Sequence, residues 1–495
     1  MTTISTLRSN FAMSSAAKVW ELIAFIVIST IVTLSFLKMG SLVSVVILFA
    51  SVGLICFLVC FTRIEYGFYG ILVFGFLMAS IDRIFREQYP LTSVLMVCPY
   101  LLTFIILLRG MLRRDFSSIS WHPIIVFYLL QVAYIIVEIF NPEMESYLGW
   151  LSSFWQKISY VLLLLSSLYI FKSIKNIRFF FKFIAIAIFL TGLYGCIQQW
   201  YGLSSFDTRW VHSDPHILGL FSLPGSGLRK FSTMTDPANF GTLMAGGGAL
   251  LLVLFLGPFS KKKRLLLLSF SIFVLLGMSY SGTRTANITL LAGLMLFILM
   301  SIYQKKTQTL VFFGGLVFVA LLFAPVYGNV TLNRFRSAFK KPGNDASYNV
   351  RIVHQEFMQP YMRKHAYGGG VNTAGGPGSK YNPNHFLAGF PPDGAYFALA
   401  LQEGWLGLLL NNIFFFLILF YCVRYFYKCK SEEIKTYYAA MGSMLFALFL
   451  GAYAQFTITS VPQSLIFIIF LGVIAKLHTF DQPVALNEDR NFKKN

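Results

Sequence analysis

Eighteen consecutive uncharged residues, LVFFGGLVFVALLFAPVY, occupy positions 310–327 of this chain. A helix of this length crosses a hydrocarbon layer of about 30 Å. Similar apolar runs recur throughout the sequence, in which 56% of the 495 residues are hydrophobic and only 12% are charged. Such a composition excludes a water-soluble fold. Because lipid offers no partner for an unpaired backbone polar group, the runs are expected to be helices, and the fold class to be an all-α, polytopic membrane bundle.

The apolar runs predict about 12–14 spanning helices in this bundle. The predicted spans are residues 19–37, 42–61, 66–81, 91–108, 124–140, 158–171, 179–200, 240–258, 265–279, 286–302, 310–327, 405–423, 436–456 and 461–475. Short clusters of Lys and Arg, such as residues 261–264, recur between alternate spans. Since short cytoplasmic loops carry the excess of positive charge, this alternation predicts that both termini are cytoplasmic and that residues 201–239 and 328–393 are external.

The same reading divides the chain into six parts. They are N-terminal spans (1–200), a first long external loop (201–239), central spans (240–327), a large external loop (328–393), C-terminal spans (394–480) and a cytoplasmic tail (481–495). Residues 19–37 form a full-length apolar run with no small-residue cleavage site, so we expect a first span there and not a removed signal peptide.

The net charge of +20 does not indicate a nucleic-acid-binding protein. The basic residues lie in short clusters between spans, which is typical of membrane topology and predicts contact with membrane lipids. The six cysteines lack the spacing of a disulfide framework or a zinc site. A P-loop, a nucleophile elbow, a His-Glu-x-x-His pair and an Asp-x-Asp motif are also missing from the sequence. We therefore expect no metal and no cofactor.

The polar stretch 328–393 is the longest departure from hydrophobicity in the chain, and it contains Arg351, His385 and, at its end, Asp393. Loops of this length are usually either functional or disordered. Its tyrosines, phenylalanines and paired glycines favour an ordered active-site loop. The alternative is a solvated connector whose arginines only face water.

Arginines stand at three outward positions of the predicted topology. Arg229 precedes the turn signal DP (236–237), Arg284 lies in the short turn SGTR (281–284), and Arg351 lies in the large loop. A guanidinium offers a planar fork of donors that suits a phosphate. The alternatives are binding of lipid headgroups by Arg229 and a snorkelling anchor at Arg284.

Taken together, these stretches resemble the O-antigen ligase and O-antigen polymerase superfamily of membrane glycosyltransferases. The resemblance rests on FNP (140–142), the segment from Arg229 to DP (236–237), SGTR (281–284), GGG (368–370) after Arg351, and EGWLG (403–407), in that order. It implies metal-independent transfer of a glycan from a polyprenyl diphosphate carrier to a hydroxyl of a glycan or lipid-linked sugar. The reaction is expected at the outer face of the bacterial inner membrane, in surface polysaccharide biosynthesis. Arg229, Arg284 and Arg351 are then expected to converge on the donor diphosphate.

The chain departs from this family at the position of the residue that deprotonates the acceptor. The family usually opens the helix before EGWLG with His-Asn, where this chain has Asp393-Gly394. Asp393 is favoured as the base because it occupies the matching position, although a helix N-terminus stabilises its negative charge and weakens it as a base. His385 is the alternative, and an altered or lost activity is a third possibility.

Two functions of other classes compete with glycan transfer. A flippase or other transporter of lipid-linked glycans needs polar residues deep in many spans, whereas the charge here is concentrated in the external loops. A non-catalytic membrane scaffold would leave the arginines replaceable. The sequence does not separate a ligase from a polymerase, because the two share the donor chemistry and differ in the acceptor.

Overall fold

The computed structural model describes residues 59–85, 90–113, 121–223, 227–326, 328–339 and 346–481. Contacts divide the described residues into two compact units, residues 59–67 with 104–113, and the remaining described residues from 68 to 103 and from 121 to 481. In the smaller unit, Arg109 Nη1 donates a hydrogen bond of 3.1 Å to the carbonyl of Thr62. All the candidate site residues belong to the larger unit.

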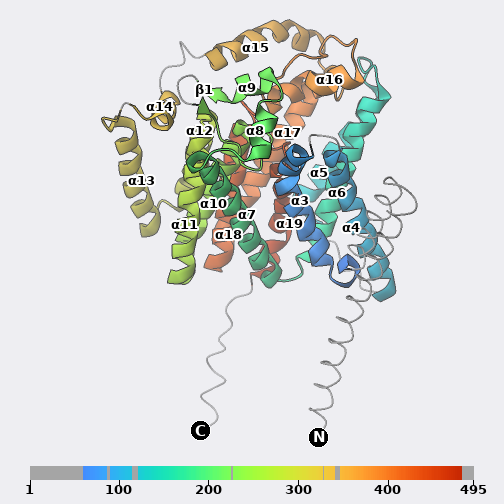
Figure 1. Ribbon diagram of the computed structural model, residues 1–495. Helices are drawn as coiled ribbons and strands as arrows, with labels where there is room; N and C mark the ends of the chain where they lie inside the picture. Colours follow the sequence, from blue (N-terminus) through green and yellow to red (C-terminus); the bar gives the residue numbers. More distant parts are fainter. Residues whose placement is uncertain are drawn as a thin grey trace, which may run out of the picture. The chain divides into compact units, whose positions relative to one another are not determined.

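The described part of the chain is almost entirely helical (Figure 1). Its helices are α3 (Ile64–Ile84), α4 (Leu91–Arg113), α5 (Pro123–Val137), α6 (Tyr147–Ile170), α7 (Ile174–Trp200), α8 (Ser205–Val211), α9 (Pro215–Phe221), α10 (Pro237–Leu256), α11 (Lys261–Tyr280), α12 (Arg284–Ser301), α13 (Lys305–Phe323), α14 (Val330–Ser337), α15 (Ala346–Lys364), α16 (Gly375–Tyr381), α17 (Ala395–Lys428), α18 (Glu432–Gly451) and α19 (Gln463–Leu477). Strands β1 (Ser222–Leu223) and β2 (Gly227–Leu228) form a small antiparallel pair.

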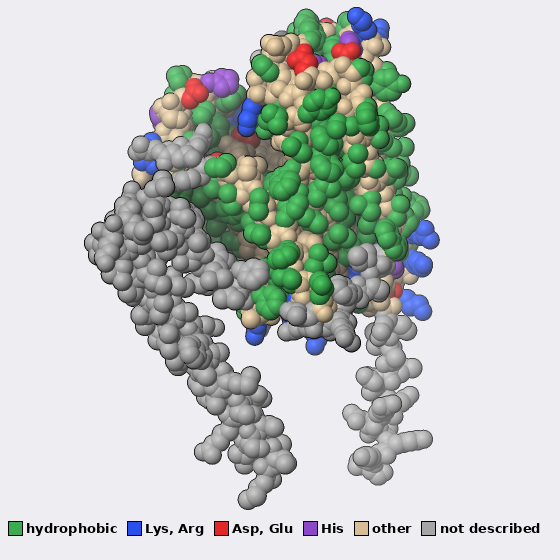
Figure 2. Space-filling view, turned by 90° about the vertical axis from the view of Figure 1, so that its right-hand side faces the viewer, with side chains coloured by type: hydrophobic (Ala, Val, Ile, Leu, Met, Phe, Trp, Pro, Cys, Tyr) green, Lys and Arg blue, Asp and Glu red, His purple; other side chains and the backbone are tan. Residues whose placement is uncertain are grey.

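Eleven helices of the described residues are long and apolar enough to cross a membrane, which confirms the all-α, polytopic fold class. Helix α6 covers the predicted span 158–171 but is not one of the eleven. Predicted span 19–37 and most of span 42–61 lie outside the described residues. On the face drawn in Figure 2, hydrophobic side chains form a band between charged side chains at its two ends. Exposed apolar surface of this kind is what a lipid-facing protein requires.

Helix α10 is the most deeply buried of these candidate spans, because 83% of the residues in its apolar stretch are buried inside the protein. Asp236 caps the start of this helix, because its Oδ1 accepts hydrogen bonds of 2.8 Å from the backbone N–H groups of both Ala238 and Asn239. Pro237 occupies the first turn, where no N–H is needed. Helix α10 contacts α11, α12 and α18. A methyl group on Gly247 would lie 2.6 Å from Ile188 of α7, so the packing of α10 against α7 requires a small residue at this position.

The two long polar segments lie at the same end of the bundle (Figure 1). The backbone N–H of Lys230, in the first segment, donates to the carbonyl of Tyr280 at the end of α11. Leu228 of the first segment and Asn329 of the second line the same cavity. That this end faces outward stays a prediction from the charge pattern.

Helix α17 is broken at Gly404, where φ is 65° and ψ is −165°. At the break, the triple-glycine loop (368–370) binds two carbonyls of the helix. The N–H groups of Gly369 and Gly370 donate to the carbonyls of Leu401 and Gln402, each at 2.9 Å. A methyl group on Gly368 would lie 2.5 Å from the carbonyl oxygen of Gln402. These glycines therefore allow the loop to approach the protein's own helix closely.

Replacing Gly404 with Ala should lower the thermal stability of the purified protein. This combination of positive φ and extended ψ is essentially confined to glycine and costs a residue with Cβ about 1–3 kcal/mol, and the new methyl group would clash with the carbonyl oxygen of Ala366. Gly314→Ala is the control, since that helical glycine in α13 has nothing within 4 Å of an added Cβ and Ala is the better helix former. Equal melting temperatures for Gly404→Ala and the wild type would contradict the assigned break.

Candidate active site

His354 and Asp393 form a hydrogen-bonded pair where α15 meets the start of α17. The distance between His354 Nδ1 and Asp393 Oδ2 is 2.9 Å, and both side chains are about one quarter exposed, at 26% and 20%. The Phe390 ring packs edge-on against the imidazole at 5.2 Å. When Nδ1 carries the proton, it donates to the carboxylate and leaves Nε2 as an acceptor. An imidazole oriented by a carboxylate in this way is a common general base.

Arg351 lies on α15, one turn before His354. Its Nη2 donates a hydrogen bond of 3.3 Å to the carbonyl of Ala454, in the loop between α18 and α19. The same loop supports the start of α17, because the carbonyl of Ala452 accepts a bond of 3.4 Å from the N–H of Tyr396. Arg351 and the His354–Asp393 pair therefore share one junction of three segments that are distant in the sequence.

Arg229 is bound to the turn that carries Arg284. Its Nε donates to the carbonyl of Ser281 at 2.9 Å, and its Nη2 donates to Thr283 Oγ1 at 2.8 Å. Thr283 Oγ1 in turn donates to the carbonyl of Pro237 at 2.9 Å, so the turn is also attached to the start of α10. Two of the five guanidinium N–H groups of Arg229 thus hold the SGTR turn in place.

A third arginine that the sequence analysis did not single out, Arg334 of α14, joins this group. Burial and the positive charges of Arg334 and Arg284 lower the pKa of Arg229 to about 10, against the opposing effect of Asp236. Arg229 therefore remains charged at neutral pH. A cavity of about 300 Å³ lies beside the turn and is lined by Gly282 and Arg334. The structure thus brings Arg229 and Arg284 together, whereas Arg351 has the other neighbours described above.

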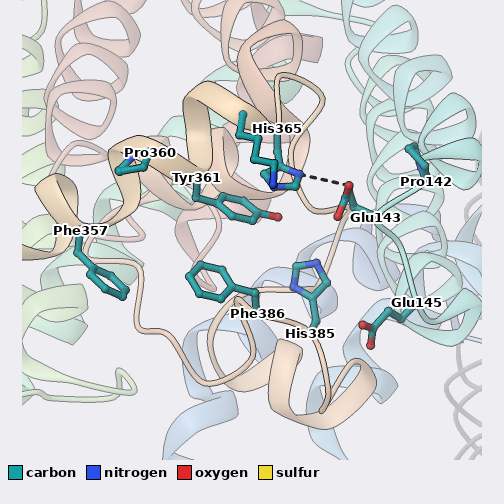
Figure 3. A pocket seen from close by; sticks show the side chains of 10 residues that line it. Pro142, Glu143, Glu145, Phe357, Pro360, Tyr361, His365, His385 and Phe386 are labelled. Carbon is teal, nitrogen blue, oxygen red and sulfur yellow. Dashed lines mark ion pairs between the residues drawn. The ribbon is translucent and has the colours of Figure 1, made fainter.

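His385 lines a different cleft, drawn in Figure 3 with Tyr361, Phe386 and Glu143. Its Nδ1 accepts a hydrogen bond of 3.1 Å from the N–H of Leu387. Burial is the main cause that lowers the pKa of His385, so the neutral imidazole is favoured at neutral pH. With Nδ1 occupied as an acceptor, the proton of the neutral ring is on Nε2. His385 therefore presents a donor to the cleft.

The FNP motif brings two carboxylates to this cleft. Asn141 Nδ2 donates to Glu138 Oε2 at 2.9 Å and to the carbonyl of Tyr367 at 3.1 Å, while Asn141 Oδ1 accepts from the N–H of Glu143 at 3.1 Å. This amide joins the end of α5 to the loop that packs on the break in α17. Glu143 and Glu145 follow it and line the cleft.

A second cavity of about 360 Å³ descends beside the start of α17 into the bundle. Its lining includes Gln156, Lys157, Gln402 and Tyr396, together with several aromatic rings. A space of this size at the start of α17 can accept part of a polar ligand.

Sequence reasoning overlooked His354, Arg334 and the two glutamates. One signal was present for His354, because it lies three residues after Arg351 on a predicted helix and so shares its face. Arg334 carried no comparable signal, since its importance depends on the placement of α14 beside the SGTR turn.

The fold and these groups of side chains define a polytopic helical membrane protein with a polar, arginine-rich site at one end of its bundle. Residues 269–411 match the sequence model of a protein family described as O-Antigen ligase. This match confirms the predicted resemblance to the O-antigen ligase and O-antigen polymerase superfamily in this part of the chain. The family indicates a glycosyltransferase-like membrane enzyme of surface polysaccharide synthesis. A comparison of the chain with curated proteins gives no match.

Proposed function

We propose that this protein transfers a glycan from a polyprenyl diphosphate carrier to a sugar hydroxyl, at the outer face of the bacterial inner membrane. The observation that carries the proposal is the His354–Asp393 pair, at 2.9 Å, one helical turn from Arg351. The pair supplies a general base at the junction where the family's histidine would stand. Asp393 is then the positioning residue, and the acceptor's proton goes to the imidazole.

In the proposed reaction, His354 Nε2 takes the proton of the acceptor hydroxyl as its oxygen attacks the anomeric carbon of the donor sugar. The bond from that carbon to the carrier's diphosphate breaks, and the diphosphate leaves with an additional negative charge. Fixed positive charges aimed at such a group lower the barrier, and this is usually a large contribution to catalysis. Asp393 stabilises the imidazolium that forms.

The arginines are proposed to bind the diphosphate in two roles. Arg334 lines the cavity next to the SGTR turn, Arg284 belongs to that turn, and both supply positive charge near Arg229. Arg229 fixes the turn through Ser281 and Thr283, and its charge adds to the positive field of that site. Arg351 is placed to contact the donor where the diphosphate comes near His354.

The direct test uses purified protein in vesicles with a lipid-diphosphate-linked glycan and one of two acceptors, lipid A core or a second glycan chain. Transfer should release the free lipid diphosphate and extend one acceptor, which also distinguishes ligase from polymerase. Movement of the lipid-linked glycan across the vesicle membrane without transfer would instead identify a transporter, with the 360 Å³ cavity as its route.

Substituting Arg229 with Lys should weaken donor binding although the positive charge remains. An ammonium has no planar fork with which to bind the Ser281 carbonyl and the Thr283 hydroxyl together, so the SGTR turn is expected to loosen. We expect a roughly tenfold higher KM for the donor, which corresponds to about 1.4 kcal/mol. Arg336→Lys is the control, because the Arg336 guanidinium binds the carbonyls of Leu321 and Val326, near the C-terminal end of α13, and not the SGTR turn. Unchanged donor KM in Arg229→Lys would contradict the positioning role.

A further inference from the structure

A cleft of about 670 Å³ opens between α15, the segment after the FNP motif and the loop that contains His385 (Figure 3). Three aromatic rings form its wall. Phe386 stacks on Tyr361 with ring centroids 5.3 Å apart and an interplanar angle of 21°, and on Phe357 at 6.5 Å and 28°. Phe357 and Phe386 are 62% and 60% exposed, respectively. The wall is therefore an apolar stack of rings, two of which are open to a ligand.

Polar groups surround this wall. Glu143 Oε1 lies 3.2 Å from His365 Nδ1, and Glu145 and the donor His385 lie on the same side of the cleft (Figure 3). The hydroxyl of Tyr361 is buried and has no hydrogen-bond partner among the residues that the structure describes. Burial raises the pKa of Tyr361 to about 12, so the hydroxyl keeps its proton and can donate it. The cleft thus offers both hydrogen-bond acceptors and hydrogen-bond donors around its apolar wall.

We propose that this cleft binds a saccharide, and that it is the acceptor subsite. A pyranose ring has an apolar face of C–H groups that packs on an aromatic ring and a rim of hydroxyls that both donate and accept hydrogen bonds. Carboxylates accept from hydroxyls, while Tyr361 and His385 donate to them. The two carboxylates, at residues 143 and 145, outnumber the one ammonium in the lining, that of Lys364, and so disfavour a phosphate or another polyanion at this place.

The cleft leads along α15 to the proposed base, and this step rests on the proposed function. Arg351, His354, Phe357 and Tyr361 follow one another at spacings of three, three and four residues, which places them on one face of the helix. Phe390 lies next to both Phe357, at 6.4 Å, and His354, at 5.2 Å. The helix rises about 1.5 Å per residue, so His354 and Tyr361 are separated by about 10 Å along its axis. A short oligosaccharide held on the wall can therefore place its terminal hydroxyl at His354.

A binding experiment without a donor tests the subsite. The probe is the saccharide released by mild acid from the lipid carrier of the producing cells, added to the full-length protein in nanodiscs and followed by saturation-transfer NMR. Binding to the wild type should weaken at least tenfold in Phe386→Ala and in Phe357→Ala. Tyr348→Ala is the matched control, because that exposed aromatic residue lies on α15 but does not line the cleft. It should bind the saccharide as the wild type does.

Two outcomes would overturn the assignment. The first is equal saccharide binding by the wild type and both phenylalanine variants. The second is unchanged saccharide binding combined with strong quenching of a probe at Phe357 by lipid-attached quenchers, which would identify the wall as a membrane anchor. Because no donor is present, the result is separate from glycan transfer. A protein that binds the saccharide in this cleft but transfers nothing would refute the proposed reaction and leave the subsite intact.

Discussion

His354→Ala should reduce glycan transfer by about 10²–10⁴-fold, the contribution typical of a positioned general base. Binding of the lipid-linked donor should survive, since the imidazole is bonded to Asp393 and not to the arginines beside the SGTR turn. Asp393→Asn should be comparably inactive. Its amide N–H can donate to Nδ1, which moves the imidazole proton to Nε2 and removes the acceptor that the reaction needs. Single-turnover transfer at saturating donor measures the chemical step.

Two further histidines make this experiment discriminating. His216→Ala, at an exposed position of α9, should transfer glycan at the wild-type rate. His385→Ala should raise the KM for the acceptor and leave kcat largely unchanged, because His385 lines the saccharide cleft. An active His354→Ala protein together with an inactive His385→Ala protein would move the base to His385, and activity in both would place it elsewhere.

Asp207→Ala should destabilise the protein by about 3–5 kcal/mol, the cost of leaving one member of a buried ion pair without its partner. Asp207 Oδ1 lies 2.9 Å from Arg83 Nε, and the two side chains are 0% and 2% exposed. Asp207 Oδ2 accepts hydrogen bonds from Tyr194 at 2.7 Å, Ser204 at 2.9 Å and Gln198 at 3.0 Å. All of these bonds would be lost together.

Arg83 transmits this effect to the candidate site. Its guanidinium donates to the carbonyls of Met234, at 2.6 Å, and Ser232, at 2.7 Å, and so fixes the chain between Arg229 and the start of α10. Thermal melting in detergent should show a large fall for Asp207→Ala and almost none for Lys435→Ala. The latter removes a pair with Glu432, whose side chain is 62% exposed, and such a pair is worth about 0–1 kcal/mol. Replacing both buried charges, as in Arg83→Met with Asp207→Leu, should recover part of the loss. Equal melting of Asp207→Ala and Lys435→Ala would show that the buried pair contributes nothing.

The Asp393 position shows what a resemblance can and cannot predict. Its match to the family's histidine position led to the prediction that the carboxylate itself is the base. The structure adds the contact with His354, which suggests that carboxylate and imidazole work as one unit. The idea that His385 was the other candidate arose from proximity in the sequence, and proximity gives no information about which cleft a side chain lines.

The sequence by itself determined the helical membrane fold, because a spanning segment must satisfy its own backbone hydrogen bonds and is therefore encoded locally by an uncharged run such as 310–327. It also indicated a turn at residues 236–237 before the span predicted at 240–258, since a turn signal depends on adjacent residues. Only the tertiary structure decided that His354 meets Asp393, that Arg229 holds the SGTR turn, and that Arg83 meets Asp207. These contacts join segments that are far apart in the chain. They depend on how helices pack and where loops return, which no local pattern of residues encodes.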